Sequence, residues 1–374
     1  MRIALISHTH FYWTGLYARY FITQGHDVRV ISFSEEPLEG VPVDYIGRGT
    51  PSRRKALHYF AGVPALRSRL QEFAPDVAFA TYVSSNGLLT ALCHSGPLVV
   101  SAHGSDVLAG PGGAWASARM IRFTCRRADV VHAVSQHLVD ALVGLRVPAD
   151  PIHCFPIGVD ADWFVPPAEG RSDDIPPRVV CTRHQESVYA NETIVESLAL
   201  LRAEGLDVRA TLIGGGALLA ERRAQARELG LEDLVELPGH QPPEHVRRAL
   251  QTASVYVSAS TSDGASSSLL EAMACGLFPV VSAIPANVGW IENGATGLLF
   301  EPGDTRGLAD ALRRAVLDAD LRASAEARNR ALVLREGNLT LNLARMEALL
   351  VRATELHRGP ARRNRRVSER RVSS

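Results

Sequence analysis

The chain has 374 residues, 46% of them hydrophobic, which is enough for two domains that each bury a sizeable core. The formal net charge is zero, no apolar run reaches the roughly 18 to 20 residues that span a bilayer, and MRIALIS lacks the pattern of a secretory signal, so a cytoplasmic protein is expected. Five dispersed cysteines argue against both a disulfide framework and a zinc cluster.

The first half alternates short apolar strands with helices. Helical spacing runs from Leu16 to Gln24 and from Ala65 to Phe73, and Gly25 suits the end of the first helix. Strands separated by helices of this length predict a parallel sheet with helices on both faces. The predicted strands are RIALIS (2–7), DVRVISF (27–33), VAFATY (77–82), LVVSAHG (98–104), ADVVHAVS (128–135) and DPIHCFPIGVD (150–160).

A proline-rich break, VPPAEGRSDDIPPR at 165–178, reads as a linker, and the same alternation then restarts. We expect two doubly wound, Rossmann-like domains, 1–166 and 167–337, that face a central cleft. The amphipathic segment 338–357 is expected to cross back onto the first domain. The second half contains predicted strands in PRVVCTR, VRATLIG, LVELPG, SVYVSAS, FPVVS and TGLLFEP, and predicted helices at Thr193–Glu204, Ala217–Glu228, Pro243–Gln251 and Leu269–Cys275.

The tail at 358–374 carries seven Arg and one Glu, has no periodicity and is expected to be disordered. Two interpretations stay open: a solvated terminus, or peripheral contact with anionic membrane headgroups, worth about 1 kcal/mol per Arg. Nucleic-acid binding is not expected because the tail has no aromatic residue for base stacking. Lys55 is the only lysine in the chain, so a phosphate site elsewhere must use arginine or backbone amides.

The segment SDGASSSLLEAMACGLFPVVS at 262–282 carries the main functional pattern. It follows the predicted strand SVYVSAS, and ligands of parallel sheets bind at the carboxyl ends of the strands. The small residues from Gly264 lead into a helix predicted to begin at Leu269, so free N–H groups and the helix dipole favour an anion there. Asp263 and Glu271 flank the stretch, and carboxylates suit vicinal hydroxyls. A ligand with hydroxyls at both ends and phosphate between them is a nucleotide sugar.

Two interpretations of Glu271 fit its spacing equally well. Ser268-Leu-Leu-Glu271 matches the S-x-x-E capping box, in which the glutamate bonds back to the helix N-terminus. The alternative is that Glu271 binds ligand hydroxyls. Asp263-Gly264 by itself is typical of an ordinary turn.

The same segment resembles the signature region of the retaining GT-B glycosyltransferases of family 4. That family carries two acids separated by seven residues, then a Leu-Glu-Ala-Met-Ala-type helix and Gly-x-Pro-Val-Val, and the resemblance continues to ENGATGLLFEPGD at 292–304. It implies the GT-B fold. Weaker similarities cover most of the chain: SAHGSDV (101–107), ADVVHAVS (128–135), PIGVDADWF (156–164) and LIGGGALL (212–219).

The resemblance also implies roles for individual residues. Glu271 is expected to hold the nucleotide ribose, Asp263 the hydroxyls of the donor sugar, and the amides of 264–267 the diphosphate or the sugar. The implied catalytic residues are His103, which contacts the donor sugar near the reacting carbon, Asp263 and Arg183. The implied donor-binding residues are Arg183, Tyr189, Gly239, Asp263, Gly264, Ala265, Ser266, Ser267, Leu270 and Glu271.

Several positions depart from the family pattern. The first acid of the pair is usually Glu, not Asp263, and the lysine usually found five residues after Arg183 is replaced by Val188. Arg183 can pair bidentately with phosphate, but the site lacks the second charge. In place of a Gly-Gly loop after the first strand stands HTHFYWTG (8–15), whose aromatic residues either pack over the sheet edge or shape an acceptor pocket. The asparagine that commonly precedes Gly-Val-Asp is Ile157.

The function implied is a metal-independent retaining hexosyltransferase that uses a nucleotide-sugar donor, UDP-sugar first and GDP-sugar next, and a glycan, lipid-linked or natural-product acceptor. A weak or inactive nucleotide-sugar-binding protein is the alternative. A nicotinamide dehydrogenase would need a glycine fingerprint after the first strand, which HTHFYWTG is not. No metal or other cofactor is expected, since the Asp-Ala-Asp runs at 160–162 and 318–320 lie in a pre-linker segment and a helix.

Overall fold

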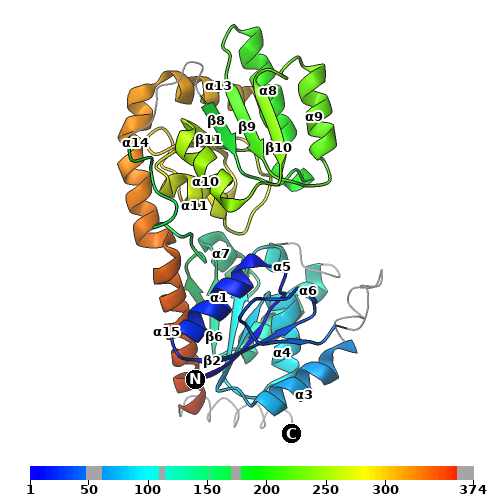
Figure 1. Ribbon diagram of the computed structural model, residues 1–374. Helices are drawn as coiled ribbons and strands as arrows, with labels where there is room; N and C mark the ends of the chain where they lie inside the picture. The colour runs from blue at the N-terminus through cyan, green and yellow to red at the C-terminus, as the bar shows by residue number, and fades with distance from the viewer. Residues whose placement is uncertain (48–60, 109–113, 151, 170–177, 360–374) are drawn as a thin grey trace. The chain divides into compact units, whose positions relative to one another are not determined.

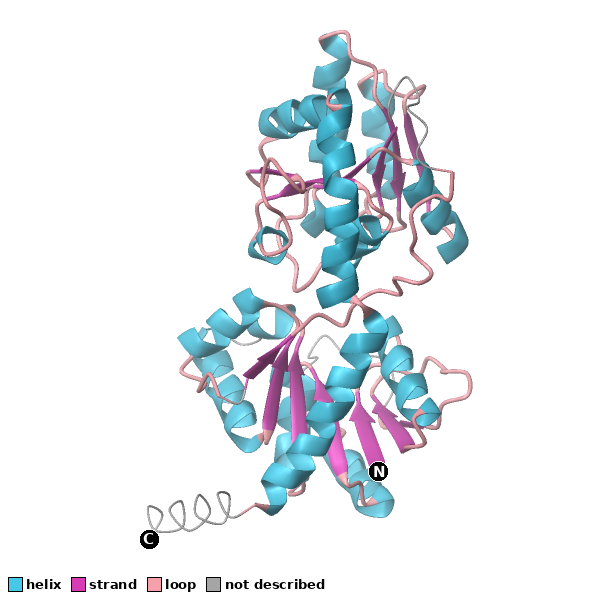
Figure 2. Cartoon of the chain, turned by 90° about the vertical axis from the view of Figure 1, so that its left-hand side faces the viewer, coloured by secondary structure: helices cyan, strands magenta, loops and turns pink. Residues whose placement is uncertain are grey.

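The computed structural model describes residues 1–47, 61–108, 114–150, 152–169 and 178–359. The chain forms two compact units, Met1–Ile157 with Leu341–Ser374, and Gly158–Thr340. Most of the basic tail, Lys55 and the middle of the linker lie outside the described residues. Each unit is an α/β layer structure in which helices cover both faces of one sheet (Figures 1 and 2).

The first unit contains a seven-stranded parallel sheet in the order β3-β2-β1-β4-β5-β6-β7. The central strands β1, β4 and β5 are almost entirely buried, because helices cover both of their faces. The strands are β1 (Arg2–Ile6), β2 (Asp27–Ser32), β3 (Val43–Tyr45), β4 (Val77–Thr81), β5 (Leu98–Ala102), β6 (Val130–Ala133) and β7 (Ile152–Cys154). The helices are α1 (Tyr12–Thr23), α3 (Val63–Phe73), η1 (Val83–Gly87), α4 (Leu88–Cys93), α5 (Ser105–Leu108), α6 (Ala114–Arg127) and α7 (Gln136–Gly144).

The long C-terminal helix α15 (Leu339–Arg358) packs on the first unit from Leu341 onward. Glu347 accepts a hydrogen bond from the hydroxyl of Tyr20 (3.1 Å), and its carboxylate lies 2.8 Å from His26 Nε2. At the far end of the helix, His357 Nδ1 lies 3.1 Å from Asp129 Oδ2. These polar contacts fix the helix along its length, while Met346 and Leu350 on the same helix are fully buried.

The second unit contains a six-stranded parallel sheet in the order β10-β9-β8-β11-β12-β13. Its strands are β8 (Arg178–Cys181), β9 (Arg209–Ile213), β10 (Val235–Gly239), β11 (Val255–Ser258), β12 (Phe278–Ser282) and β13 (Leu298–Phe300). Its helices are η2 (Ser187–Tyr189), α8 (Asn191–Ala203), α9 (Leu219–Glu228), α10 (Pro243–Thr252), α11 (Ser267–Ala274), α12 (Pro285–Val288), α13 (Thr305–Leu317), α14 (Ala319–Leu332) and η3 (Val333–Gly337).

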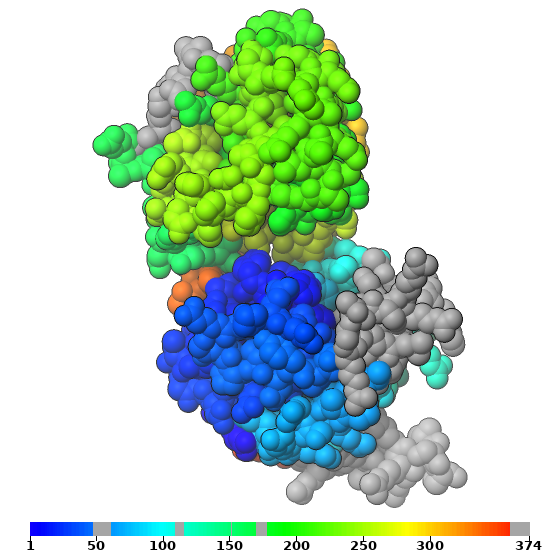
Figure 3. Space-filling model, turned by 45° about the vertical axis from the view of Figure 1, so that its right-hand side comes forward, coloured from blue at the N-terminus to red at the C-terminus, as the bar shows by residue number. Residues whose placement is uncertain are grey.

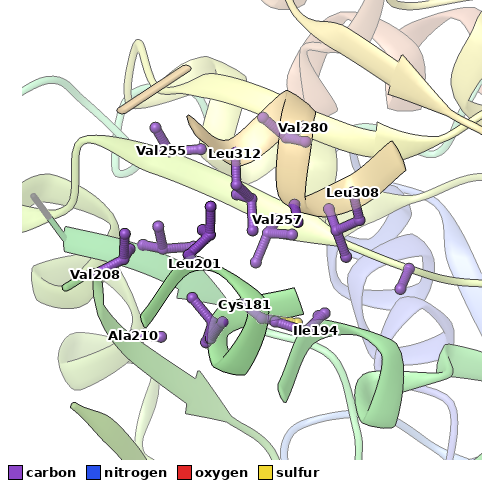
Figure 4. Packing of buried hydrophobic residues seen from close by; sticks show 14 of the residues in the cluster. Cys181, Ile194, Leu201, Val208, Ala210, Val255, Val257, Val280, Leu308 and Leu312 are labelled. Atoms are coloured by element: carbon purple, nitrogen blue, oxygen red, sulfur yellow. The ribbon is translucent and has the colours of Figure 1, made fainter. Parts of the chain in front are cut away.

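The core of the second unit follows the alternation of its strands. Val255 and Val257 point to one face of the sheet, where they pack with Leu312 of α13 and Ile194 of α8 (Figure 4). Tyr256 points to the other face, into a cluster that includes α11. By contrast, α9 buries only Ala226 and α10 only Leu250, and both helices lie at the surface of the unit (Figure 3). The buried strands therefore form a rigid base for the loops that follow them.

The unit boundary falls nine residues earlier than the sequence-based boundary at 166. Val159, Ala161 and Phe164 are buried in the same cluster as α11, and the N–H of Val159 donates to the carbonyl of Gly337 (2.8 Å). These residues thus belong to the second unit, although they precede the prolines of the linker. The point where the chain changes from one core to the other therefore precedes the proline run.

The predicted fold class, two parallel-sheet Rossmann-like domains, is confirmed. Two details were wrong. The short strand β3 was not predicted, because its sequence VDY is half-exposed and lacks an apolar run. The first helix begins at Tyr12 rather than Leu16, since the aromatic residues assigned to a loop form its first turn. In the described part of the chain, no helix is long and apolar enough to cross a membrane.

Candidate functional site

The loop between β11 and α11, together with α11 itself, contains most of the predicted donor-binding residues. Ser266 is the N-cap of α11, and its Oγ accepts a hydrogen bond from the N–H of Leu269 (3.4 Å). The N–H of Ser267 donates to the carbonyl of Ala265 (3.1 Å). The N–H groups of Gly264, Ala265 and Ser266 have no acceptor among the described residues. Three amides at the positive end of a helix are therefore available to an anion.

The capping-box interpretation of Glu271 is wrong. The helix begins two residues earlier than predicted, so Ser268 lies inside its first turn and not at the N-cap. Ser268 Oγ instead accepts from Arg183 Nη1 (2.9 Å) and from the hydroxyl of Tyr256 (3.0 Å). The carboxylate of Glu271 is half-buried and has no hydrogen-bond partner among the described residues. Burial raises the pKa of Glu271 to about 7, against the opposing charge of Arg183.

Arg183, which follows β8, is buried and lies at the centre of the site. Its Nη1 donates to the hydroxyls of Ser268 and Ser266 (3.4 Å), its Nη2 forms an ion pair with Asp263, and its guanidinium lies 4.2 Å from the ring centroid of Tyr189. Burial is the largest single influence and lowers the pKa of Arg183, but the charge and hydrogen bond of Asp263 and the nearby Tyr256 and Tyr189 together raise the pKa above its ordinary value. Arg183 and Asp263, which were expected to bind separate groups of the ligand, are thus in direct contact.

The backbone around Arg183 is fixed by residues that the sequence analysis did not single out. Asn191 Nδ2 donates to the carbonyl of His184 (3.0 Å), and the N–H of Gln185 donates to the carbonyl of Gly215 (2.8 Å). A Cβ at Gly214, where φ is +154°, would overlap the carbonyl oxygen of Arg183. Gly214–Gly216 is therefore not only a turn, because its glycines let the loop after β9 approach the Arg183 segment.

The remaining predicted donor residues lie around this centre. The carbonyl of Gly239, at the end of β10, accepts from the N–H of Gly214 (3.0 Å). Leu270 is buried in the core cluster below the helix, where its side chain packs. Val188, at the position of the missing lysine, is 38% exposed, and its carbonyl accepts from the N–H of Thr261 (2.9 Å). The β8 segment and the start of the Asp263 loop are therefore connected through the Val188 backbone.

In the first unit, His103 follows β5 and stacks between two aromatic rings. Its ring centroid lies 5.4 Å from that of Trp13 and 5.2 Å from that of Tyr82, with interplanar angles of 15° and 14°. Burial, with a smaller contribution from His132, lowers the pKa of His103 to about 3. Its Nε2 is buried and has no hydrogen-bond partner among the described residues. His103 is thus expected to be a neutral imidazole near pH 7. In that form it donates a hydrogen bond through one ring nitrogen and accepts one through the other.

The aromatic residues after β1 stack on one another, which agrees with the packing interpretation; the acceptor-pocket interpretation stays a prediction. Phe11 stacks on Trp13 (centroids 4.4 Å apart) and on Tyr82 (5.2 Å), which links the ends of β1, β4 and β5. Tyr82 adopts φ of +64°, an uncommon conformation for a residue with a side chain. The side chain of the neighbouring Tyr12, by contrast, is 54% exposed.

Asp106, which the sequence analysis did not predict, ties this region together. One carboxylate oxygen accepts from the N–H of Val83 (2.7 Å), and the other accepts from the N–H groups of His103 (3.0 Å) and Gly104 (2.9 Å). Burial raises the pKa of Asp106 and these hydrogen bonds oppose that shift. The Ser-Asp pair directly after His-Gly was the available sequence signal.

The first acid of each Asp-Ala-Asp run accepts hydrogen bonds from nearby backbone N–H groups. Asp160 accepts from the N–H groups of Asp162 (3.1 Å) and Trp163 (3.0 Å). Asp318 is the N-cap of α14 and accepts from the N–H of Leu321 (2.9 Å). No group of three or more metal-ligating side chains occurs within the ranges that the structure describes.

Comparisons with known proteins agree with this architecture. Residues 3–163 match the family described as Glycosyltransferase Family 4, and residues 169–332 match glycosyl transferases group 1. A crystal structure of the Anabaena protein HepE in complex with UDP superposes with a TM-score of 0.79 over 94% of this chain and 100% of that chain, at 17% identity. Sucrose-phosphate synthase from Thermosynechococcus elongatus gives the same TM-score over 93% and 98%, at 19% identity.

Two sequence relatives illustrate the range of coverage. The GDP-mannose:cellobiosyl-diphosphopolyprenol alpha-mannosyltransferase of Xanthomonas oryzae is 28% identical over 77% of this chain and 80% of that protein. The amylovoran biosynthesis glycosyltransferase AmsK of Erwinia amylovora is 28% identical over 46% of this chain and 44% of that protein. The chain spans about half the length of the first relatives that it matches.

The fold, with one parallel sheet in each of two units, is that of the GT-B class. The two halves of the chain thus match glycosyltransferase family models, and the fold is that of its GT-B structural neighbours.

Proposed function

We propose that the protein is a retaining glycosyltransferase of family 4 that transfers a hexose from a nucleotide-sugar donor and needs no metal ion. The observation that supports this most strongly is the composition of the α11 N-terminus: free amides at Gly264, Ala265 and Ser266, the guanidinium of Arg183, and the unpartnered carboxylate of Glu271. Amides and Arg183 suit the diphosphate, and Glu271 suits the ribose hydroxyls.

In this proposal the leaving nucleoside diphosphate gains negative charge as the glycosidic bond breaks. Arg183 and the amides stabilise that charge in a preorganised site, as donors in an oxyanion hole do. For His103 we keep the role that the resemblance implies, contact with the transferred sugar, as a prediction. Because burial lowers the pKa of His103, we propose that it acts as a neutral imidazole rather than as an imidazolium acid. We favour attack on the same face from which the diphosphate departs, with the departing phosphate taking the acceptor proton, over a covalent intermediate on Asp263.

Relatives and structural neighbours point to two donors to test first. Several sequence relatives are named as GDP-mannose-dependent enzymes, and the HepE structures were determined with UDP, UDP-glucose or UDP and glucose. Names such as colanic acid and amylovoran biosynthesis, and a diphosphopolyprenol acceptor, support a glycan or lipid-linked acceptor. An acceptor of that kind would suit peripheral contact of the basic tail with anionic membrane.

The test is a donor panel of UDP-, GDP- and ADP-sugars with the full chain, read out as nucleoside diphosphate release and as product formation with lipid-linked and free glycan acceptors. Retention is checked by proton NMR of the anomeric position of the product. Turnover that persists in EDTA supports metal independence. Inversion of configuration, or a strict metal requirement, would contradict the corresponding part of the proposal.

A second candidate is a nucleotide-sugar-binding protein with little or no turnover. The observation that favours it is Val188 at the position of the second phosphate-binding cation. Binding of a nucleotide sugar without turnover across the panel of donors and acceptors would support this candidate over the enzyme.

A further inference from the structure

The donor site holds its central arginine in an internal ion pair. Nη2 of Arg183 contacts Oδ2 of Asp263, and the two side chains are only 9% and 18% exposed. Nη1 donates to Ser268 Oγ (2.9 Å), and the face of the guanidinium lies over Tyr189. A phosphate group binds arginine best through two parallel N–H groups. One amino group lies on a carboxylate, the other lies on serine hydroxyls, and Nε, which has no hydrogen-bond partner among the described residues, is buried. Asp263 therefore occupies an amino group that a diphosphate would need for a bidentate contact with Arg183.

The net charge of the site determines how strongly this ion pair weakens the binding of a nucleoside diphosphate. Asp263 neutralises Arg183, Val188 supplies no second cation, and the pKa of Glu271 near 7 adds a partial negative charge at neutral pH. A nucleoside diphosphate carries several negative charges. The paired state of Arg183 therefore attracts a free nucleoside diphosphate weakly, because only the amides of the α11 loop favour it.

We infer that Asp263 alternates between two partners, Arg183 in the empty site and the hydroxyls of the donor sugar in the loaded site, and thereby makes the site prefer a nucleotide sugar over its nucleoside diphosphate product. This inference rests on the proposed function. A bound sugar supplies hydroxyl donors to the carboxylate, which releases Arg183 to the diphosphate. When the sugar leaves with the acceptor, Asp263 returns to Arg183 and competes with the diphosphate, which promotes product release.

The variant that tests the inference is Asp263→Asn, which keeps the shape of the side chain and removes its charge. Titration calorimetry with the full chain measures the Kd of UDP, UDP-glucose, GDP and GDP-mannose for wild type and variant. The uncharged asparagine competes less strongly for Arg183, so the variant should bind the free diphosphate about tenfold more tightly than wild type. The nucleotide sugar should gain less or lose affinity, because the side-chain amide of the variant is a weaker acceptor for its hydroxyls. The ratio of Kd for the diphosphate to Kd for the nucleotide sugar should therefore fall.

Two further variants separate this effect from a general change in the charge of the unit. Glu232→Gln removes one charge from an exposed side chain just before β10, at the opposite end of the sheet, and should leave both Kd values unchanged. Val188→Lys, at an exposed position in the short helix η2, adds a second cation and should tighten binding of the diphosphate even with Asp263 present. Thermal unfolding confirms that each variant is folded.

The possible outcomes separate the inference from the proposed function. A wild-type protein that binds a nucleotide sugar, together with a lower ratio in Asp263→Asn, supports the inference. Unchanged or weaker diphosphate binding in Asp263→Asn overturns it and leaves the proposed function standing. If wild type binds none of the four nucleotides but binds an ADP-sugar, the same ratio is measured with ADP. A wild type that binds no sugar nucleotide overturns both.

Discussion

The ends of the strands are used differently in the two units. After β8 and β11 of the second unit, the chain gathers charged and polar groups: Arg183, Asp263 and the hydroxyls and amides at the start of α11. After β1, β4 and β5 of the first unit, it gathers stacked rings around a neutral histidine. Both regions occupy the edge where parallel sheets bind ligands, but only the second has the chemistry to hold an anion.

The difference extends to how each region is kept in place. In the second unit the side chains that are predicted to bind the ligand contact one another, since Arg183 contacts Asp263 and Ser268 directly. In the first unit the backbone is fixed by Asp106, a buried carboxylate that accepts three N–H groups, and the rings stack on that frame. Substitutions in the second unit should therefore change ligand binding first, and substitutions in the first unit should change stability first. Four predictions test this contrast.

The largest effect is expected for Arg183→Ala. Removal of the guanidinium should lower kcat about 100- to 1000-fold, because the charge of the leaving diphosphate is no longer stabilised. Thermal unfolding should change much less than turnover. The control is Arg202→Ala, which breaks an exposed ion pair with Asp233 in the same unit and should leave kcat unchanged. Wild-type turnover in Arg183→Ala would refute the diphosphate assignment.

In the first unit, Asp106→Asn should cost about 1 to 3 kcal/mol of unfolding free energy, since at least one buried N–H loses its acceptor. Because Asp106 positions His103, kcat should also fall, by about tenfold, while the Kd of the donor nucleotide stays constant. Asp129→Asn is the matched control: Asp129 accepts from the N–H of Leu98 at the other end of β5 (3.0 Å). It should lower stability without lowering kcat. Equal kcat losses in both variants would show that Asp106 acts only through stability.

The pKa of Glu271 predicts a pH-dependent term in stability. The carboxyl has a pKa of about 7 in the folded chain and an ordinary pKa of 4.5, so the folded state binds the proton more tightly. The stability from this group is complete below pH 4.5 and is lost as the pH rises through about 7. The term should be on the order of 1 to 2 kcal/mol, allowing for partial exposure. The measurement is the unfolding free energy of wild type and of Glu271→Gln at about pH 5 and pH 8. The variant should lack this pH-dependent term; an equal change in unfolding free energy between the two pH values in both proteins would disprove the pKa shift.

The smallest effect is expected in the ring stack. Trp13→Leu keeps apolar contact but removes stacking with Phe11 and His103, which should cost roughly 1 kcal/mol. Tyr12→Leu, at an exposed neighbouring position, should cost less than half of that. Urea denaturation of the two variants measures the difference. Turnover in Trp13→Leu also tests the acceptor-pocket interpretation of this loop, because a pure packing role predicts little change in the KM of the acceptor.

The sequence was sufficient for the fold because the buried strands are near-continuous apolar runs and the helices between them have clear spacing. It was sufficient to propose a donor loop because Asp263, the small residues and Glu271 lie within one short segment. It could not show that Arg183 and Asp263 touch, since they are 80 residues apart and meet only through the pairing of β8 with β11. Nor could it reveal the contacts of Asp106: the Ser-Asp pair after His-Gly marks the residue, but its three partners are backbone N–H groups that the sequence does not identify.

The capping question shows a second limit. Ser268 and Glu271 have the spacing of a capping box, and the pattern alone does not tell where the helix begins. The side chain of Ser266 takes the N-cap position, so the helix starts earlier and Ser268 turns toward Arg183 and Tyr256. A change of two residues in the helix start converts Glu271 from a structural cap into a carboxylate available for a ligand.

The central claim is that the start of α11 receives the pyrophosphate of a sugar nucleotide. A crystal structure of the full chain soaked with UDP-glucose or GDP-mannose tests it most directly. We expect phosphate density within hydrogen-bond distance of the amides of Gly264–Ser266 and of the Arg183 guanidinium, with the ribose on Glu271. Nucleotide bound elsewhere, while Arg183 stays on Asp263 and those amides face solvent, would contradict the claim.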